Sequence, residues 1–361
     1  MSDKSPRIVG FDIARAYAIF GMFIVNFNFS FGVLSDPSIE GRFLGLFVGN
    51  STAIFIILAG MGVSLMSNRG DYNAAEKKKL RSTVLKRSWF LFAIGLLLYN
   101  WWPGDILHFY GGYMHIAAFL LFVPNRYFLW AATICIALYH ILLLIIPVGT
   151  GWDLQTFNYV DFWTPLGFLR NTIYNGWNSM FPWMAYFLLG MWFGRQDWQS
   201  KRFKRGVFIT GMVFFLLFQC LRLVAKNGVF SEFWTFYIMS EYIPPYLPFM
   251  VITASFACMV IPVCMYLGAR FSTAKWMLWL AQTGRMTLSH YVIHITLGMV
   301  LFSTLSGKTY GGLLEDEMPT APLTILGFSI FFFVMSVAFS FFWSKWFKNG
   351  PLESIMRKIS G

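Results

Sequence analysis

Polar and ionisable side chains that interrupt long apolar segments are the first candidates for chemistry in this sequence. Asn26 and Asn28 interrupt the first such segment, and His290 and His294 interrupt one near the C-terminus. A side chain of this kind is costly where water is absent, so it usually faces the protein interior and has a partner or a task. We therefore expect these residues to line a functional site.

His290 and His294 stand four residues apart, which places both side chains on one face of a helix. Such a pair suits a general base with a helper, as acyl or proton transfer requires, or a pair of metal or haem ligands. No third ligand stands at the spacing of a metal motif, so we predict no metal site. In a third interpretation the two imidazoles only hydrogen-bond neighbouring helices.

Three further residues, His108, Asp105 and Arg285, complete the candidate chemistry. His108 follows Asp105 by three residues at the edge of another apolar segment, where the carboxylate can orient the imidazole. His108 is therefore the third candidate for the catalytic base, and Asp105 joins the substrate-binding candidates. Arg285 follows Gly284 and is predicted to bind a phosphate or a thioester oxygen, or else a backbone carbonyl.

The first apolar segment carries a longer polar stripe. Asp12 and Arg15, three residues apart, are expected to form an ion pair, and Asn26 lies eleven residues after Arg15 on nearly the same helical face. Three turns of polar positions on one face predict that this helix lines a cavity.

These positions belong to a chain of 361 residues that is 57% hydrophobic and only 12% charged, against about 25% in an ordinary soluble domain. The apolar residues come in blocks of about 18 to 25, the length of a helix that crosses ~30 Å of hydrocarbon. This pattern excludes a water-soluble fold and predicts an all-α, polytopic transmembrane bundle. The four cysteines lie inside apolar blocks without CxxC spacing, so no disulfide framework or zinc site is expected.

About ten spans are expected, and charge sets their orientation. The connections that alternate to one side hold 22 Lys and Arg, whereas the other side holds 4. By the positive-inside rule both termini are then cytoplasmic, and the net charge of +12 faces a membrane rather than nucleic acid. The predicted spans are 12–33, 43–66, 86–101, 106–123, 127–147, 179–194, 206–225, 244–268, 276–304 and 323–344.

The connections between these spans are short, so residues 1–361 are predicted to form a single transmembrane domain in the cytoplasmic (inner) membrane of a cell. The longest outer loop is 148–178. The tail 350–361 places Leu352, Ile355, Met356 and Ile359 on one face, which predicts a helix on the cytoplasmic surface. A homo-oligomer is compatible with this organisation.

Several motifs resemble the YeiB-like family of bacterial membrane proteins. They are residues 7–15 running on to Asn26, the stretch 284–291, the terminal Gly350-Pro351-Leu352-Glu353, and residues 105–111. That family is related to transmembrane acyltransferases, including heparan-α-glucosaminide N-acetyltransferase and the sugar O-acyltransferases. Asn26 stands where the O-acyltransferases have a functional His. The heparan enzyme is similar to this chain in having Asn at that position. That enzyme's catalytic His comes from the following outer loop, however, and residues 34–42 here contain none.

The resemblance implies transfer of an acyl group from cytoplasmic acyl-CoA or acetyl-CoA to a sugar or lipid acceptor at the outer face. One of the three histidines would then remove the acceptor's proton, while Asn26 and Arg285 stabilise charge on the thioester oxygen. The phosphates of CoA would be attracted by Arg15, Lys86 and Arg87.

Two alternatives remain open from the sequence. A transporter or flippase for a small anionic or lipid-linked solute also suits a polar stripe with buried histidines. A membrane protein whose interior polar groups only hold helices together is the third.

Overall fold

The computed structural model describes residues 8–33, 35–68, 71–153, 155–308 and 319–361. Arg7, the first residue of the motif at the N-terminus, lies outside this set. The described part is built from α-helices with one two-stranded antiparallel hairpin, β1 (Trp152–Asp153) and β2 (Asn158–Tyr159). The expectation of an all-α bundle is confirmed apart from this small hairpin.

Eight helical segments within the described residues are long and apolar enough to cross a membrane, so the chain is an integral, multi-pass membrane protein. They are α1 (Val9–Phe31), α2 (Ile39–Gly45) continued by α3 (Asn50–Met66), α4 (Ala74–Tyr99), α6 (Arg126–Ile145), α9 (Lys201–Lys226), α11 (Leu247–Arg270), α13 (Thr287–Ile293) continued by η2 (His294–Gly298) and α14 (Met299–Ser306), and α15 (Pro322–Trp343).

Two of the ten expected spans, 106–123 and 179–194, coincide with shorter helices. These are α5 (Leu107–Leu120) and α8 (Met180–Phe193), each of 14 residues. At ~1.5 Å per residue such a helix covers only about 21 Å. Both are largely buried against other helices, so neither has to match the thickness of the lipid by itself.

The remaining helices are short and connect or cover the long ones. They are α7 (Pro165–Arg170) with η1 (Asn171–Asn175), α10 (Glu232–Ile238), α12 (Lys275–Gly284) and α16 (Pro351–Ser360). The predicted span 276–304 is therefore broken between α12 and α13. The predicted tail helix is present as α16, which packs against α4 and α13.

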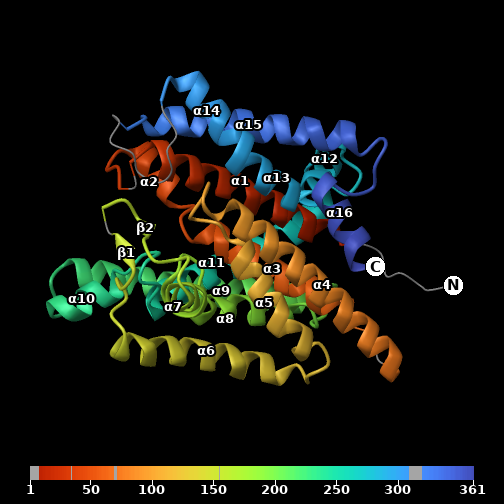
Figure 1. Ribbon diagram of the computed structural model, residues 1–361, viewed down its shortest axis with the longest axis horizontal. Helices are drawn as coiled ribbons and strands as arrows, with labels where there is room; N and C mark the ends of the chain where they lie inside the picture. Colours follow the sequence, from red (N-terminus) through yellow and green to blue (C-terminus); the bar gives the residue numbers. More distant parts are fainter. Residues whose placement is uncertain (1–7, 34, 69–70, 154, 309–318) are drawn as a thin grey trace.

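Helix α1 lies at the centre of the bundle, where it contacts α3, α11, α12 and α15. Close helix packing relies on glycine at Gly60, where a Cβ would lie 2.0 Å from the Phe187 carbonyl oxygen of α8. Different elements lie at the two ends of the helical bundle (Figure 1). The start of α1, the start of α4 and α16 gather at one end, here called the terminal end, while α2, the hairpin and α10 lie at the other, the loop end.

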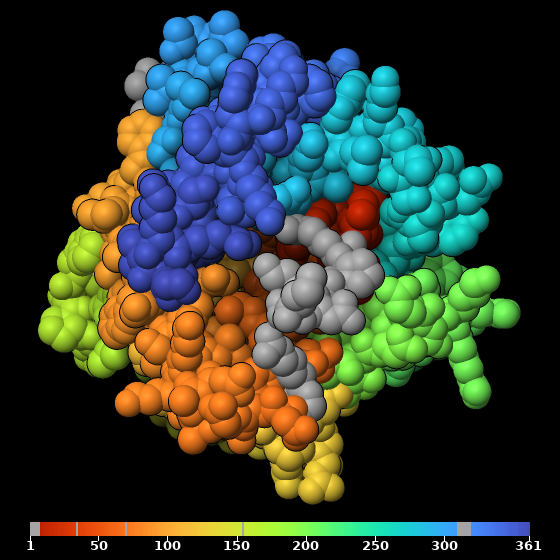
Figure 2. Space-filling model, turned by 90° about the vertical axis from the view of Figure 1, so that its right-hand side faces the viewer, coloured from red at the N-terminus to blue at the C-terminus, as the bar shows by residue number. Residues whose placement is uncertain are grey.

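Figure 2 views the terminal end, where the start of α1 is visible in a hollow between α12 and α4. Helix α16 covers one side of this face. The polar residues at the two ends of α1 therefore face different surroundings, with Arg15 nearer the terminal end and Asn26 nearer the loop end.

Candidate functional site

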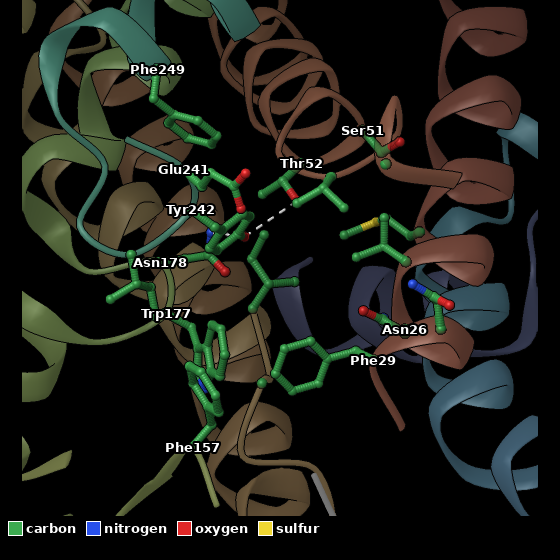
Figure 3. Close-up of a pocket in the computed structure, with 18 of the residues that line it drawn as sticks. Asn26, Phe29, Ser51, Thr52, Phe157, Trp177, Asn178, Glu241, Tyr242 and Phe249 are labelled. Carbon is green, nitrogen blue, oxygen red and sulfur yellow. Dashed lines mark hydrogen bonds between the residues drawn. The ribbon is translucent and has the colours of Figure 1, made fainter. Parts of the chain in front are cut away.

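A cavity of about 440 Å³ lies at the loop end, beside the last turns of α1. Its size is in the range of pockets that hold small-molecule ligands. Side chains from α1, α3, α11, α13 and several connecting segments meet around it (Figure 3). The polar lining residues are Asn26, Asn28, Ser35, Ser51, Thr52, Asn178, Arg222, Glu241, Tyr242 and Tyr291.

Asn26 projects from α1 into this cavity, and a hydrogen bond to His294 fixes its side chain. The Asn26 Nδ2 atom lies 2.9 Å from His294 Nε2, and His294 Nδ1 lies 3.3 Å from the His290 carbonyl oxygen. A carbonyl can only accept, so Nδ1 carries the proton and Nε2 accepts from the Asn26 amide. In the described structure the second Asn26 N–H and its oxygen have no protein partner and are available to a ligand.

Helix geometry changes at His294, where the π-helical segment η2 begins. Isolated π-helical turns occur often at functional sites. The turn from His290 to His294 is α-helical, with the His294 backbone N–H bound to the His290 carbonyl oxygen, yet the two imidazoles contact different partners. His290 Nε2 instead donates to Ser340 Oγ of α15 at 2.7 Å, because the Ser340 hydroxyl itself donates to the Ser336 carbonyl. His290 thus joins α13 to α15.

A second polar unit, Asp105 with His108 and Tyr291, borders the cavity. Asp105 Oδ2 accepts the backbone N–H and the Nδ1–H of His108, each at 3.1 Å, and Oδ1 accepts the Tyr291 hydroxyl at 3.3 Å. The Tyr291 oxygen accepts the N–H of Ile106 at 3.1 Å. Asp105 and His108 are fully buried, and of the three only Tyr291 lines the cavity.

The orientation of His108 agrees with the expectation that Asp105 fixes its ring. With Nδ1–H bound to Asp105, the lone pair of His108 lies on Nε2, and that atom is buried without a hydrogen-bond partner in the described structure. Its ring contacts the aromatic rings of Tyr99, Phe109 and Phe162. Nε2 therefore lies on the side of the imidazole away from Asp105 and Tyr291.

The wall opposite Asn26 was not predicted from the sequence. Asn178 Nδ2 donates to the Tyr242 hydroxyl at 2.7 Å, and that hydroxyl donates to Thr52 Oγ1 at 3.3 Å (Figure 3). Burial raises the pKa of Tyr242 to about 12 despite these hydrogen bonds, so the phenol stays protonated at neutral pH. Asn178 and Tyr242 come from segments that connect helices, and no sequence spacing links them to α1.

Arg222 and Glu241 complete this wall. The Arg222 guanidinium donates to the carbonyl oxygens of Met239, at 3.0 Å, and Ser240, at 2.5 Å. These bonds fix the segment that presents Glu241 and Tyr242. Arg222 itself lines the cavity.

Asn28, predicted with Asn26, also lines the cavity, and its Nδ2 donates to the Val33 carbonyl at 3.1 Å. Arg15 lies about 16 Å from Asn26 along α1, at ~1.5 Å per residue. It pairs with Asp12 at 2.9 Å, as expected. The residues between Arg15 and Asn26 on this face are apolar and buried: Ala18, Ile19 and Met22. The predicted polar stripe is therefore interrupted.

The other predicted basic residues lie away from the cavity. Arg285 Nη2 donates to the Lys348 carbonyl at 2.6 Å, the backbone alternative that the sequence allowed. Arg87 Nε donates to Ser360 Oγ of α16 at 3.2 Å, and Lys86 is exposed. None of these residues lines the cavity, so any role in donor binding belongs to a different part of the molecule from Asn26.

Comparison with known families covers almost the whole chain. Residues 7–229 match the family described as heparan-alpha-glucosaminide N-acetyltransferase, catalytic. Residues 190–361 match the one described as protein of unknown function (DUF418), the YeiB-like family. A comparison with curated proteins finds no match. The first match contains Asn26, Asp105 and His108, and the second contains Tyr291 and His294. The resemblance expected from the motifs is confirmed.

Proposed function

We propose that this chain, which belongs to the family of heparan-α-glucosaminide N-acetyltransferase catalytic domains, transfers an acyl group from acyl-CoA to an amine or hydroxyl of a sugar or lipid acceptor. One observation carries the proposal. The amide of Asn26, fixed by His294, and the hydroxyl of Tyr291, bound to Asp105, line the same cavity. One group can bind an oxyanion and the other can move a proton.

Asn26 supplies the electrostatic part of the mechanism. When the acceptor attacks the thioester carbonyl, negative charge develops on the carbonyl oxygen, and a fixed N–H aimed at that oxygen stabilises it. The hydrogen bond to His294 holds the Asn26 carboxamide in one orientation before the donor arrives. His294 therefore acts on the reaction through Asn26 and is a positioning residue.

Tyr291 and Asp105 supply the proton transfer. As the new bond to the acyl carbon forms, the acceptor's proton passes to the Tyr291 oxygen while the Tyr291 proton passes to Asp105 Oδ1, and the C–S bond then breaks to release CoA thiolate. His108 keeps Asp105 oriented through two N–H donors. This assigns His108 a positioning role instead of the direct base expected from the sequence, because its Nε2 faces away from Tyr291.

The lining of the cavity suits an acceptor with both polar and apolar faces. The aromatic rings of Phe29, Phe157 and Trp177 line it together with the amides of Asn28 and Asn178. A sugar ring presents hydroxyls at its edge and C–H groups on its faces, so it matches such a surface.

The donor would approach from the terminal end, which we propose faces the cytoplasm in accordance with the distribution of Lys and Arg. Arg15, Lys86 and Arg87 would attract the CoA phosphates there. The acyl arm must then reach past Ala18 and Met22 to Asn26, about 16 Å along α1. A donor whose phosphates and acyl group are about this far apart can contact Arg15 at the terminal end and Asn26 in the cavity at the same time.

Binding and turnover of acetyl-CoA by the purified protein test the proposal. We expect isothermal titration to show binding, and radiolabelled acetyl-CoA to label glucosamine or a lipid-linked amino sugar. Asn26→Ala should keep the binding but lower kcat by about 10²–10³, the usual effect of removing an oxyanion donor. Asn227→Ala, at the exposed end of α9, is the matched control. If wild-type protein binds neither acetyl-CoA nor longer acyl-CoA esters, the transporter alternative takes its place.

A further inference from the structure

We propose that Glu353, in the C-terminal helix α16, is a positioning residue for this reaction: it caps α13 and so sets where His294 holds Asn26. The role in the reaction rests on the proposed function, whereas the coupling between α16 and His294 does not. In this proposal the Gly350-Pro351-Leu352-Glu353 motif has a role, although its residues do not line the cavity.

The Glu353 carboxylate meets the first turn of α13 with both oxygens. Oε1 accepts the backbone N–H groups of Leu288 at 2.8 Å and Ser289 at 3.2 Å, and Oε2 accepts the Ser289 hydroxyl at 2.5 Å. The Ser289 hydroxyl oxygen in turn accepts the Leu352 N–H at 3.1 Å. Glu353 is 9% exposed, so a buried charge-bearing group is committed entirely to this contact.

Helix α13 needs this cap because its own sequence does not supply one. The residue before it, Met286, makes no side-chain hydrogen bond to the helix. The first N–H groups of a helix have no partner within the helix, and a buried unpaired N–H is costly. A carboxylate at this end also interacts favourably with the helix dipole. Glu353 provides both from a segment more than sixty residues away in the sequence.

The glycine of the motif makes room for the carboxylate. A Cβ on Gly350 would lie 2.2 Å from Glu353 Oε2 and 2.8 Å from the Ser289 hydroxyl. Pro351 follows at the first position of α16, where its missing N–H costs nothing. Gly350 and Pro351 therefore serve the placement of Glu353.

The capped turn is mechanically close to the site. His294 follows Ser289 by five residues, about 7.5 Å along the helix. Between them His290 is tied to Ser340, so α13 is held on one side by α15 and at its start by α16. A loss of the cap frees the start of α13, and a small rotation there separates His294 Nε2 from the Asn26 amide, now 2.9 Å away.

Helix α16 is itself anchored to the bundle away from α13. Arg87 of α4 donates to Ser360 at its last turn, and Leu352 and Met356 pack on the hydrophobic core. Helix α16 is therefore held in place between α4 and α13. It acts through its fixed position and makes no contact with substrate in this proposal.

The test compares Glu353→Ala, Glu353→Gln and Ser289→Ala with Lys358→Ala, a change at an exposed position of the same helix. Two readouts are used on the full-length protein in nanodiscs. The first is the imidazole nitrogen NMR spectrum of the five histidines, which reports the tautomer and hydrogen bond of His294. The second is steady-state kinetics with acetyl-CoA, together with acetyl-CoA binding by titration.

We expect Glu353→Ala to shift the His294 signals and to lower kcat about tenfold or more, with the Kd for acetyl-CoA within about twofold of wild type. Glu353→Gln and Ser289→Ala, which keep part of the cap and the volume of the site, should give smaller changes in the same direction. Lys358→Ala should change neither readout.

Unchanged His294 signals in all three cap variants would overturn the coupling, even if the variants were less stable. Shifted His294 signals with an unchanged kcat would overturn the positioning role. If wild-type protein neither binds nor turns over any CoA ester, the proposed function fails, yet the NMR comparison still decides whether α16 sets the position of His294.

Discussion

Replacing Tyr291 with phenylalanine isolates the proton-transfer step, because it removes one oxygen at the wall of the cavity and nothing else. In the structure that oxygen donates to Asp105 and accepts the buried N–H of Ile106. Loss of the acceptor leaves the Ile106 N–H unpaired, which costs about 1–3 kcal/mol of stability. Loss of the proton carrier should lower kcat by about 10²–10⁴, the usual contribution of general acid–base catalysis.

A control must separate the two effects. Tyr110 is also buried, and its hydroxyl donates to the Phe55 carbonyl at 2.6 Å, but it does not line the cavity. Tyr110→Phe should therefore lower stability by about 1 kcal/mol and leave kcat within about threefold of wild type. By comparison, the 10²–10⁴-fold fall in kcat expected for Tyr291→Phe corresponds to a loss of about 2.7–5.4 kcal/mol of transition-state stabilisation.

Initial rates of radiolabelled acetyl transfer, measured beside thermal unfolding of each variant in the same detergent, provide the comparison. If Tyr291→Phe unfolds at a lower temperature but keeps a kcat close to that of Tyr110→Phe, then Tyr291 is structural and the proton route through Asp105 is wrong.

Three further predictions concern other parts of the structure. His294→Leu leaves the Asn26 amide unfixed, so kcat should fall about 10–100-fold while acetyl-CoA binding is kept; equal loss of binding would contradict a positioning role. Gly60→Ala forces a Cβ to within 2.0 Å of a carbonyl of α8 and should lower the unfolding temperature by several degrees, whereas Gly327→Ala, with open space around it, should not. Burial raises the pKa of Glu353 above its usual 4.5, so the stability that its protonated form contributes is fully present below pH 4.5 and is lost as pH rises through the raised value. Unfolding curves of wild type should show this loss and those of Glu353→Gln should not.

The membrane fold was predictable because it depends on local features of the sequence. Apolar blocks of span length mark the long helices, and these appear close to the expected positions. The breaks were not predictable in the same way. The division of 276–304 at Arg285 lies where Gly284 packs so closely on α1 that a Cβ would be 1.7 Å from the Asp12 carbonyl oxygen, a tertiary contact that hydropathy does not report.

The candidate site was predictable in part. Cost in an apolar environment singled out Asn26, His294 and the Asp105–His108 pair, and the structure places all of them in or beside the cavity. The i, i+4 spacing of His290 and His294 predicted a shared face, and the turn between them is α-helical, but the structure gives them different partners, Ser340 for His290 and Asn26 for His294. The side chain that each imidazole meets depends on how α1 and α15 pack around α13, which a single sequence does not show.

The remaining lining residues come from connections whose path only the folded chain defines. Asn178 and Tyr242 lie in segments that connect helices, and only the folded chain shows that Asn178 bonds Tyr242 and Tyr242 bonds Thr52 at the cavity. Tyr291 belongs to the motif 284–291, but nothing in the sequence gives it a role, because only the fold shows that its hydroxyl binds Asp105.

A cryo-electron microscopy map of the protein with acetyl-CoA tests most directly whether acyl transfer takes place at Asn26. The expected map shows the CoA phosphates at the terminal end and the thioester carbonyl oxygen at about 3 Å from Asn26 Nδ2, inside the loop-end cavity. Density for the thioester at any place out of reach of Asn26 would contradict the mechanism proposed for this cavity.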